Sequence, residues 1–218
     1  MSKSIKLESP LHYFHAALNR KPEPVKSPAG ALFNDEAEYG LVVKEATLSA
    51  HLNLRGDGSN AHFCSEVTEA LGLMVPLTPG TYQRNGNTSI YWLGPSEWLL
   101  VEIGGDAEEL ETRLRKTLTG HISIVDISGG QTCINLRGPG VATVLKKSSI
   151  YDFEAWDNAT SALGRAVQTN FAKASAIISN KSDGSYDLVI RRSFADYVAQ
   201  WLLDAGEEFG CRIEAEKE

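Results

Sequence analysis

The sequence predicts an α+β fold in which one series of elements, β-β-α-β-β-β-α, occurs twice. HLNLRGDG at residues 51–58 returns as CINLRGPG at residues 133–140. After each copy, apolar spacing predicts a helix, three further strands and a second helix. Because a segment and everything that follows it recur together, the repeated object is a folding unit and not an isolated motif.

The first half is predicted at about residues 40–119. Its second strand alternates Leu52 and Leu54 on one face with polar residues on the other, which is typical of a half-buried strand. Its strands are expected at 41–46, 49–56, 81–85, 88–94 and 97–103.

Two helices complete the first half. The helix after the second strand begins at Ser59 or Asn60, either of which can cap it, and ends at Gly72. The helix at 106–118 opens with the capping pattern of Asp106 and an acidic residue three positions on, and basic residues stand near its end, as the helix dipole favours. The apolar stripe of this second helix consists of Leu110, Leu114 and Leu118.

The second half is predicted at about residues 120–207. Its first helix follows the glycine corner Gly138-Pro139-Gly140, and its last helix begins at Ser193, with Asp196 three residues on, and ends at Gly206. The last helix is expected to bury Phe194, Val198, Trp201, Leu202 and Ala205. The strands are expected at 121–128, 131–137, 166–171, 174–179 and 186–192, the last two joined by a turn at 182–185.

The repeated L-R-G-x-G segment has two interpretations, a phosphate-binding loop and a strand-to-helix corner. A phosphate loop would require G-x-G-x-x-G or G-x-x-x-x-G-K-[ST] at the start of a helix, and neither pattern occurs in the chain. Glycine suits a tight corner because it adopts backbone angles that a β-carbon forbids. The corner interpretation is therefore favoured.

Residues 1–39 are predicted to form an N-terminal arm ahead of a single duplicated domain at 40–218, which ends in a short C-terminal tail. Pro22, Pro24 and Pro28 favour extended backbone in the arm. Two interpretations stay open for its beginning: a frayed terminus, or a docking segment with the apolar cluster Leu11, Tyr13, Phe14, Ala17 and Leu18.

Composition narrows the class of protein. With a net charge of −7 and no basic stripe, the chain is not expected to bind nucleic acid. No apolar run approaches the roughly 20 residues of a membrane span, and the N-terminus lacks the apolar core of a secretory signal, so a cytoplasmic location is expected. The three cysteines are widely spaced and predict neither a disulfide framework nor a zinc site.

No residue pattern predicts a catalytic, cofactor-binding or metal-binding site. His62 and Cys64 do not share a helix face. Asp183 and Asp187 flank a hairpin turn, where local backbone hydrogen bonds are expected. Arg191 and Arg192 point to opposite faces of a strand, and one of them can form a salt bridge. The aromatic hairpin YWLGPSEWLLV suits a core layer or a protein interface, and core is the default expectation.

Three stretches together resemble the gamma subunit of heterotetrameric sarcosine oxidase: LGPSEWLLV at 93–101, VDISGGQTCINLRGPGVATVLKK at 125–147 and YDLVIRRSFADYVAQWLLDA at 186–205. The likeness covers most of residues 40–206. More distantly, the D-I-S strand, the L-R-G-P turn and the following hairpin are similar to the folate-binding domain of the glycine-cleavage T-protein. That resemblance implies an internally duplicated α+β fold whose halves exchange their first strands.

The resemblance implies a non-catalytic subunit of a complex that oxidises sarcosine to glycine with O2 and tetrahydrofolate. FAD, FMN, NAD and tetrahydrofolate would belong to the partner alpha, beta and delta subunits, with contact mainly to the large alpha subunit. The T-protein family has an acidic pair where this chain has Gly86, Asn87 and Thr88, so folate chemistry is not carried over. The alternatives are a free-standing folate-binding aminomethyltransferase-like protein and an unrelated small-molecule binding module.

Overall fold

The computed structural model describes residues 8–12, 39–46, 48–153, 156 and 164–214. Its strands form one continuous sheet in the order β11-β1-β7-β10-β9-β8-β3-β4-β5-β2-β6. The strands are β1 (Leu41–Glu45), β2 (Ser49–Arg55), β3 (Thr81–Asn85), β4 (Thr88–Gly94), β5 (Glu97–Ile103), β6 (Ser123–Asp126), β7 (Gln131–Arg137), β8 (Gly164–Phe171), β9 (Ala174–Asn180), β10 (Tyr186–Arg191) and β11 (Cys211–Glu214).

Helices accompany this sheet at two ends of the molecule. The α-helices of the described residues are α2 (Ala61–Leu71), α3 (Ala107–Thr117), α4 (Val141–Ser148) and α5 (Ala195–Gly206). Short 3-10 helices are η1 (Ser128–Gly130), η3 (Arg192–Phe194) and η4 (Glu207–Phe209). Within the part of the chain that the structure describes, no helix combines the length and the apolar character needed to cross a bilayer.

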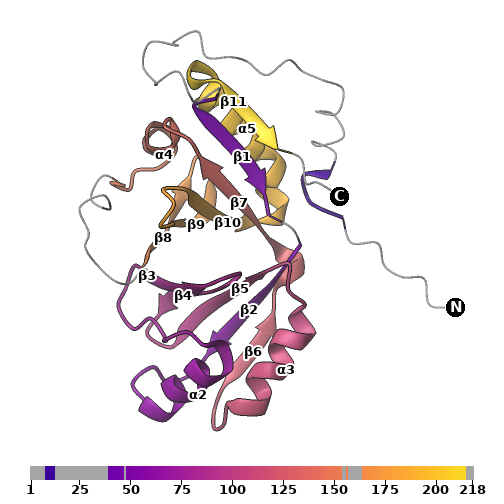
Figure 1. Cartoon of the computed structure of the whole chain (residues 1–218), viewed down its shortest axis with the longest axis vertical. Helices are drawn as coiled ribbons and strands as arrows, with labels where there is room; N and C mark the ends of the chain where they lie inside the picture. The colour runs from indigo at the N-terminus through magenta and orange to yellow at the C-terminus, as the bar shows by residue number, and fades with distance from the viewer. Residues whose placement is uncertain (1–7, 13–38, 47, 154–155, 157–163, 215–218) are drawn as a thin grey trace, which may run out of the picture.

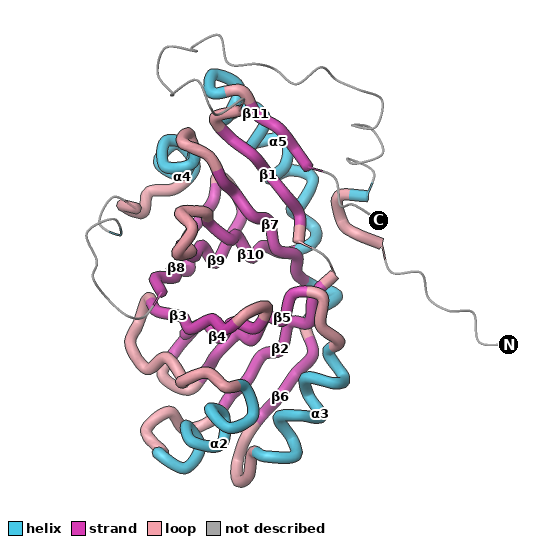
Figure 2. Tube along the Cα trace, viewed as in Figure 1, coloured by secondary structure: helices cyan, strands magenta, loops and turns pink. Residues whose placement is uncertain are grey.

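The sheet folds into two lobes, with the strands facing each other and the helices outside (Figures 1 and 2). The α2–α3 lobe contains β2 to β6, and the α4–α5 lobe contains β1 and β7 to β11. Each lobe has its own apolar core between helices and strands. A third cluster joins the inner sheet faces of both lobes, and its members are Tyr82, Tyr91, Leu99, Val101, Cys133, Ala166 and Val189.

The first strand of each half predicted from the sequence pairs with a strand of the other predicted half. β1 pairs antiparallel with β7, and Val43 lies opposite Leu136. β6 pairs antiparallel with β2, and Ile124 lies opposite Leu54. The chain therefore crosses between the lobes twice, after β1 and after β6.

The repeated corners need glycine for two different reasons. Gly138 has a φ of 114°, a left-handed angle that side chains disfavour. A β-carbon on Gly56 would lie 2.4 Å from the Phe63 ring, and one on Gly140 would lie 2.9 Å from the Gly40 carbonyl oxygen. The expectation of special backbone angles thus holds at Gly138, whereas Gly56 and Gly140 are required by close packing.

Most elements lie within a few residues of their predicted positions, since their caps and turns are local. Asn60 caps α2 by accepting from the His62 amide at 2.9 Å, and Gly72 ends that helix with a φ of 66°. Asp106 caps α3 by accepting from the amides of residues 108 and 109.

The final helix differs from its prediction. Ser193 does not cap it, because residues 192–194 form η3 and α5 starts at Ala195 without a side-chain cap. Phe194, expected in the core, is 39% exposed because it precedes the buried helix face. Val198, Leu202 and Ala205 are buried as predicted, and Trp201 is half-buried.

The expected C-terminal tail contains a strand. β11 pairs in parallel with β1, with Leu41 opposite Cys211 and Val43 opposite Ile213. Four residues are too few to give a clear periodicity, so this strand exists through its tertiary pairing. The predicted strand at 121–128 is likewise shorter, because residues 128–130 form η1.

Part of the predicted arm packs on the domain itself. Leu11 is 1% exposed and belongs to the core of the α4–α5 lobe. Ser9 donates to the Glu45 carboxylate, and Arg192 donates to the Glu8 carbonyl. The remaining residues of the apolar cluster predicted in the arm lie outside the described residues.

Candidate functional site

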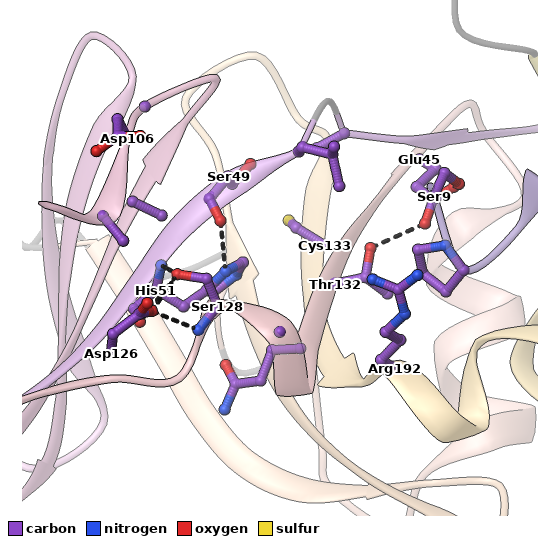
Figure 3. A pocket seen from close by; sticks show the side chains of 18 residues that line it. Ser9, Glu45, Ser49, His51, Asp106, Asp126, Ser128, Thr132, Cys133 and Arg192 are labelled. Carbon is purple, nitrogen blue, oxygen red and sulfur yellow. Dashed lines mark hydrogen bonds between the residues drawn. The ribbon is translucent and has the colours of Figure 1, made fainter. Parts of the chain in front are cut away.

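A cavity of about 290 Å³ lies where the chain crosses between the two lobes, and we call it the crossover cavity (Figure 3). It is bounded by the end of β1, the start of β2, η1, the start of β7, the first residue of η3 and the N-terminus of α3. Its polar lining residues are Ser9, Glu45, Ser49, His51, Asp106, Asp126, Ser128, Gln131, Thr132 and Arg192.

His51 dominates one side of the crossover cavity, together with Ser49, Asp126 and Ser128 (Figure 3). The His51 side chain projects toward the lobe junction from β2 and is 1% exposed. Its Nδ1 lies 3.2 Å from the Ser49 carbonyl oxygen, and its Nε2 has no hydrogen-bond partner among the described residues. Burial lowers the pKa of His51 below its ordinary 6.5, so the ring is neutral at neutral pH.

Glu45 and Arg192 stand on the opposite side, beside Ser9 and Thr132 (Figure 3). Glu45 is 3% exposed and accepts from the Thr132 hydroxyl at 2.9 Å. The Arg192 side chain stands beside this carboxyl group on the same side of the cavity. The crossover cavity therefore has an ionic side and a histidine side.

A second hollow of about 380 Å³ opens between β3 of one lobe and β10 of the other. Here Arg84 Nη1 lies 2.8 Å from Asp187 Oδ2, and Asn135 Nδ2 donates to Asp187 Oδ1 at 2.6 Å. Lys181 Nζ is 3.7 Å from the same carboxylate. Because the Asp187 side chain is only 7% exposed, this network fixes the two lobes relative to each other with well-satisfied charges.

The local role expected for the hairpin aspartates is correct for one of them. Asp183 accepts from the Ser185 amide at 3.0 Å and from its hydroxyl at 2.6 Å, and these bonds lower the pKa of the carboxyl group. The prediction is wrong for Asp187, which binds side chains from other strands. The sequence alone does not predict this network, because Arg84 and Asp187 are 103 residues apart in the chain.

The cysteines are poor nucleophiles. Cys133 lines both hollows, but burial raises the pKa of its thiol far above neutral pH, so it stays protonated. Burial also raises the pKa of Cys211 to about 12. The described residues contain no group of three histidine, cysteine or acidic side chains placed to hold a metal ion.

The other segments singled out in the sequence have structural roles. Exposed His62 lies 3.1 Å from Glu66, whereas the Cys64 thiol contacts the Gly58 carbonyl oxygen, so the two side chains do not converge. In the aromatic hairpin, Tyr91 stacks on Tyr82 with ring centroids 5.1 Å apart. Trp98 is fully buried, which supports the core interpretation.

Gly86, Asn87 and Thr88, which the sequence resemblance singled out, lie at the tip of the β3–β4 hairpin. Gly86 has a φ of 56°, and Thr88 donates to Glu102 Oε2 at 2.8 Å. The same carboxylate oxygen accepts from Arg113 Nη2 at 2.6 Å. The Glu102 carboxylate on β5 is thus already bound by the Arg113 guanidinium and the Thr88 hydroxyl.

Comparison with solved structures first defines the class of protein. Aminomethyltransferase T of the glycine cleavage system from Bartonella henselae matches with a TM-score of 0.63 and 15% identity, over 95% of this chain and 59% of that one. The chain therefore has the mixed α+β fold of T-protein-like domains.

The particular family follows from the sequence. The family model of the sarcosine oxidase gamma subunit matches residues 55–208, and the chain belongs to that family. It is 28% identical to sarcosine oxidase subunit gamma of Corynebacterium sp. (strain U-96) over 89% of this chain and 93% of that protein. It is 26% identical to the Arthrobacter sp. subunit over 85% of this chain and 90% of that protein.

A solved complex also contains a matching chain. The heterotetrameric sarcosine oxidase from Corynebacterium sp. U-96, in complex with pyrrole 2-carboxylate, matches with a TM-score of 0.76 and 24% identity. The match covers 97% of this chain and 99% of that one, so the two chains share a fold along nearly their whole length.

Proposed function

We propose that this chain is a non-catalytic gamma subunit of a heterotetrameric sarcosine oxidase, and that oxidation of sarcosine takes place in its partners. The match of the family model to residues 55–208 carries the proposal. The protonated cysteine thiols and the fully engaged Asp187 network also favour a structural role.

The proposal includes the arrangement of the assembly. FAD, FMN, NAD and tetrahydrofolate belong to the alpha, beta and delta subunits, and the main contact of this chain is with the large alpha subunit. The assembly is cytoplasmic. Within the chain, residues 1–39 form an arm, and the halves at about 40–119 and 120–207 are duplicates of one unit. Support for duplication comes from the common order of elements and the repeated glycine corners.

Co-expression with the partner subunits of the same source tests the proposal. The tagged full-length chain should capture the partners in equal amounts, and the complex should consume O2 when sarcosine is added. The chain purified alone should contain no flavin and show no sarcosine-dependent O2 consumption. Stoichiometric flavin or turnover in the chain alone would overturn the non-catalytic role, and failure to capture partners would overturn the subunit role.

Titration with tetrahydrofolate tests the enzyme-class alternative. The isolated chain should show no saturable binding, because the position of the family's acidic pair is taken by the hairpin tip at Gly86. Measurable binding would favour the folate-dependent transferase instead. An assay for transfer of a one-carbon group to the bound tetrahydrofolate would then decide whether the protein is active as a transferase.

A further inference from the structure

The second hollow, which opens between β3 and β10, is rich in cations, and we call it the basic hollow. Four of the side chains that line it are cationic and two are carboxylates: Lys44, Arg84, Arg137, Lys181, Asp183 and Asp187. The whole chain carries a net charge of −7. A hollow in which cations outnumber carboxylates is thus unusual in this acidic protein, and it attracts groups of negative charge.

Carboxylates of the chain balance two of these cations at short distances. Arg84 Nη1 lies 2.8 Å from Asp187 Oδ2. Arg137 Nη2 lies 2.6 Å from Oε1 of Glu214, which belongs to β11. The two lysines of the basic hollow have no comparable contact.

Lys181 is partly buried and has no acceptor in reach. Its side chain is 22% exposed, and its Nζ lies 3.7 Å from Asp187 Oδ1, which is too long for a hydrogen bond. The Asp187 carboxylate is already bound by Arg84 and Asn135. The donors of the Lys181 ammonium group are therefore open to a further charged acceptor, which gives the strongest hydrogen bonds.

Lys44 stands on the same face of the sheet, two strands from Asp187. It lies opposite Asn135 of β7, and Asn135 lies opposite Asp187 of β10. Lys44 is exposed, and it forms no ion pair with a residue that the structure describes. Because adjacent strands are about 4.8 Å apart, Lys44 and Lys181 border the basic hollow from different strands and can bind one acidic group each.

The rest of the lining favours a protein segment over a free anion. Ala46 and Ile103 also line the basic hollow, and both pack on the apolar cluster between the lobes. The Arg137 side chain is 52% exposed. Apolar contacts surrounded by charged side chains that solvent reaches are typical of protein interfaces.

We propose that the basic hollow receives an acidic segment of the partner alpha subunit, with carboxylates of that segment bound by Lys44 and Lys181. The inference rests on the proposed role of the chain as a subunit, and it adds the surface and the chemistry of the contact. The segment supplies the acceptors that the two lysines lack, and its charge complements the excess of cations.

Competition for the partner subunits tests the proposal. The wild-type chain and a variant are co-expressed with a limiting amount of the partners, and the complex is captured through a tag on the alpha subunit. Lys44→Glu should be incorporated about tenfold less than the wild-type chain, because it places like charges against each other. Lys44→Arg keeps the charge and should be incorporated equally.

Lys116→Glu is the matched control. It makes the same change in net charge at an exposed position of α3, away from the basic hollow, and should be incorporated as well as the wild-type chain. Urea unfolding of each isolated chain, followed by circular dichroism, shows whether the variants are equally stable.

Cross-linking of the assembled complex identifies the occupant. A carbodiimide joins an ammonium group to a carboxylate that touches it, so mass spectrometry should find Lys44 or Lys181 joined to an acidic residue of the alpha subunit. Cross-links from these lysines to a second copy of this chain, or to no other chain, would overturn the inference.

Two further results would also overturn it. One is equal incorporation of Lys44→Glu and the wild-type chain. The other is an equal loss for Lys44→Glu and Lys116→Glu, which would make the effect one of net charge. If the wild-type chain itself captures no partner, the proposed function fails, whereas capture that is insensitive to Lys44→Glu counts against this inference alone.

Discussion

Asp187 shows how a single side chain connects the two lobes. Its carboxylate is reached by Arg84 from β3, Asn135 from β7 and Lys181 from the β9–β10 connection. Arg84 comes from the α2–α3 lobe and the other residues come from the α4–α5 lobe. The network therefore fixes the position of one lobe relative to the other.

Replacing Asp187 with asparagine should destabilise the protein by about 3 kcal/mol or more, because it leaves the partly buried Arg84 guanidinium without its counter-ion. Urea unfolding followed by circular dichroism measures the change. The matched control is Glu111→Gln, which breaks the exposed pair of Glu111 and Arg115 and should cost about 0.5 kcal/mol. Equal effects of the two substitutions would contradict the burial argument.

Gly138→Ala should also be strongly destabilising, by about 2 kcal/mol. The φ of 114° disfavours a side chain, and the new β-carbon would lie 2.6 Å from the Gly40 carbonyl oxygen. Thermal or urea unfolding checks this. Gly129→Ala is the control, since its β-carbon would have no neighbour within 4 Å, and its effect should stay within about 0.5 kcal/mol. A Gly138 variant as stable as the control would refute the explanation.

At the residue level, sequence predicts side chains that act locally and misses those that act across the fold. Asn60, Asp106 and Asp183 bind backbone within a few positions, so turn and capping chemistry identifies them. His51 carries no comparable signal, because it occupies one polar position of an alternating strand. Its unpartnered Nε2 becomes evident only where the two lobes meet.

Strand β11 illustrates what determines an element of low intrinsic propensity. It extends the sheet beyond β1, and its pairing covers one edge of a strand whose Leu41 and Val43 are fully buried. Cys211 is itself 8% exposed. The strand is held by its neighbours and not by its own sequence.

A chain ending at Gly210 should therefore be less stable by about 3 kcal/mol, roughly the burial energy of two apolar side chains, Cys211 and Ile213. The control is a chain ending at Glu214, which keeps β11 and the ion pair between Glu214 and Arg137. Urea unfolding compares the two. If both chains have the stability of the full-length protein, β11 contributes nothing to stability and the argument from its pairing with β1 is wrong.

Elements with strong local patterns are predictable, whereas elements defined by their partners are not. α3 has a capping residue, an apolar stripe and basic residues at its end, so its limits are clear in the sequence. α5 lacks a side-chain cap and follows a 3-10 turn, which displaces its start from Ser193 to Ala195. β11 follows a glycine turn at Gly210, but its four residues are too few to show a strand pattern.

Across the whole molecule, contacts between the inner sheet faces link the stability of the two lobes. β3 of the α2–α3 lobe pairs with β8 of the α4–α5 lobe, and Tyr82 lies opposite Gly164. The aromatic and aliphatic cluster around Tyr82 and Val189 adds a shared core. Opening either lobe therefore breaks the β3–β8 pairing and exposes this shared core.

Calorimetry of the isolated chain should therefore show one unfolding transition, with a calorimetric enthalpy equal to the van't Hoff enthalpy. Amide exchange of Leu54 in β2 and of Leu136 in β7 should report the same free energy of opening, since both residues are fully buried in their respective lobes. Two resolved transitions, or a large difference between these two amides, would show that the lobes unfold independently.

The order of elements could be predicted because it follows the chain, but the location of the candidate site could not. The crossover cavity is built from the connection between β1 and β2, the region around η1 and the start of η3, and these three regions are far apart in sequence. Only the pairing of strands brings them together, and a single sequence shows no such pairing.

The two crossings between lobes also restrict how related chains can recombine. One genetic join between the halves would give both lobes strands of mixed parentage, with β1 facing a foreign β7 and β6 a foreign β2. Keeping each lobe from one parent requires two joins, one between β1 and β2 and one between β6 and β7. The segment that must be exchanged as one piece to keep the α2–α3 lobe intact is therefore 49–126, from the start of β2 to the end of β6. This segment does not coincide with the first half predicted from the sequence, at about 40–119.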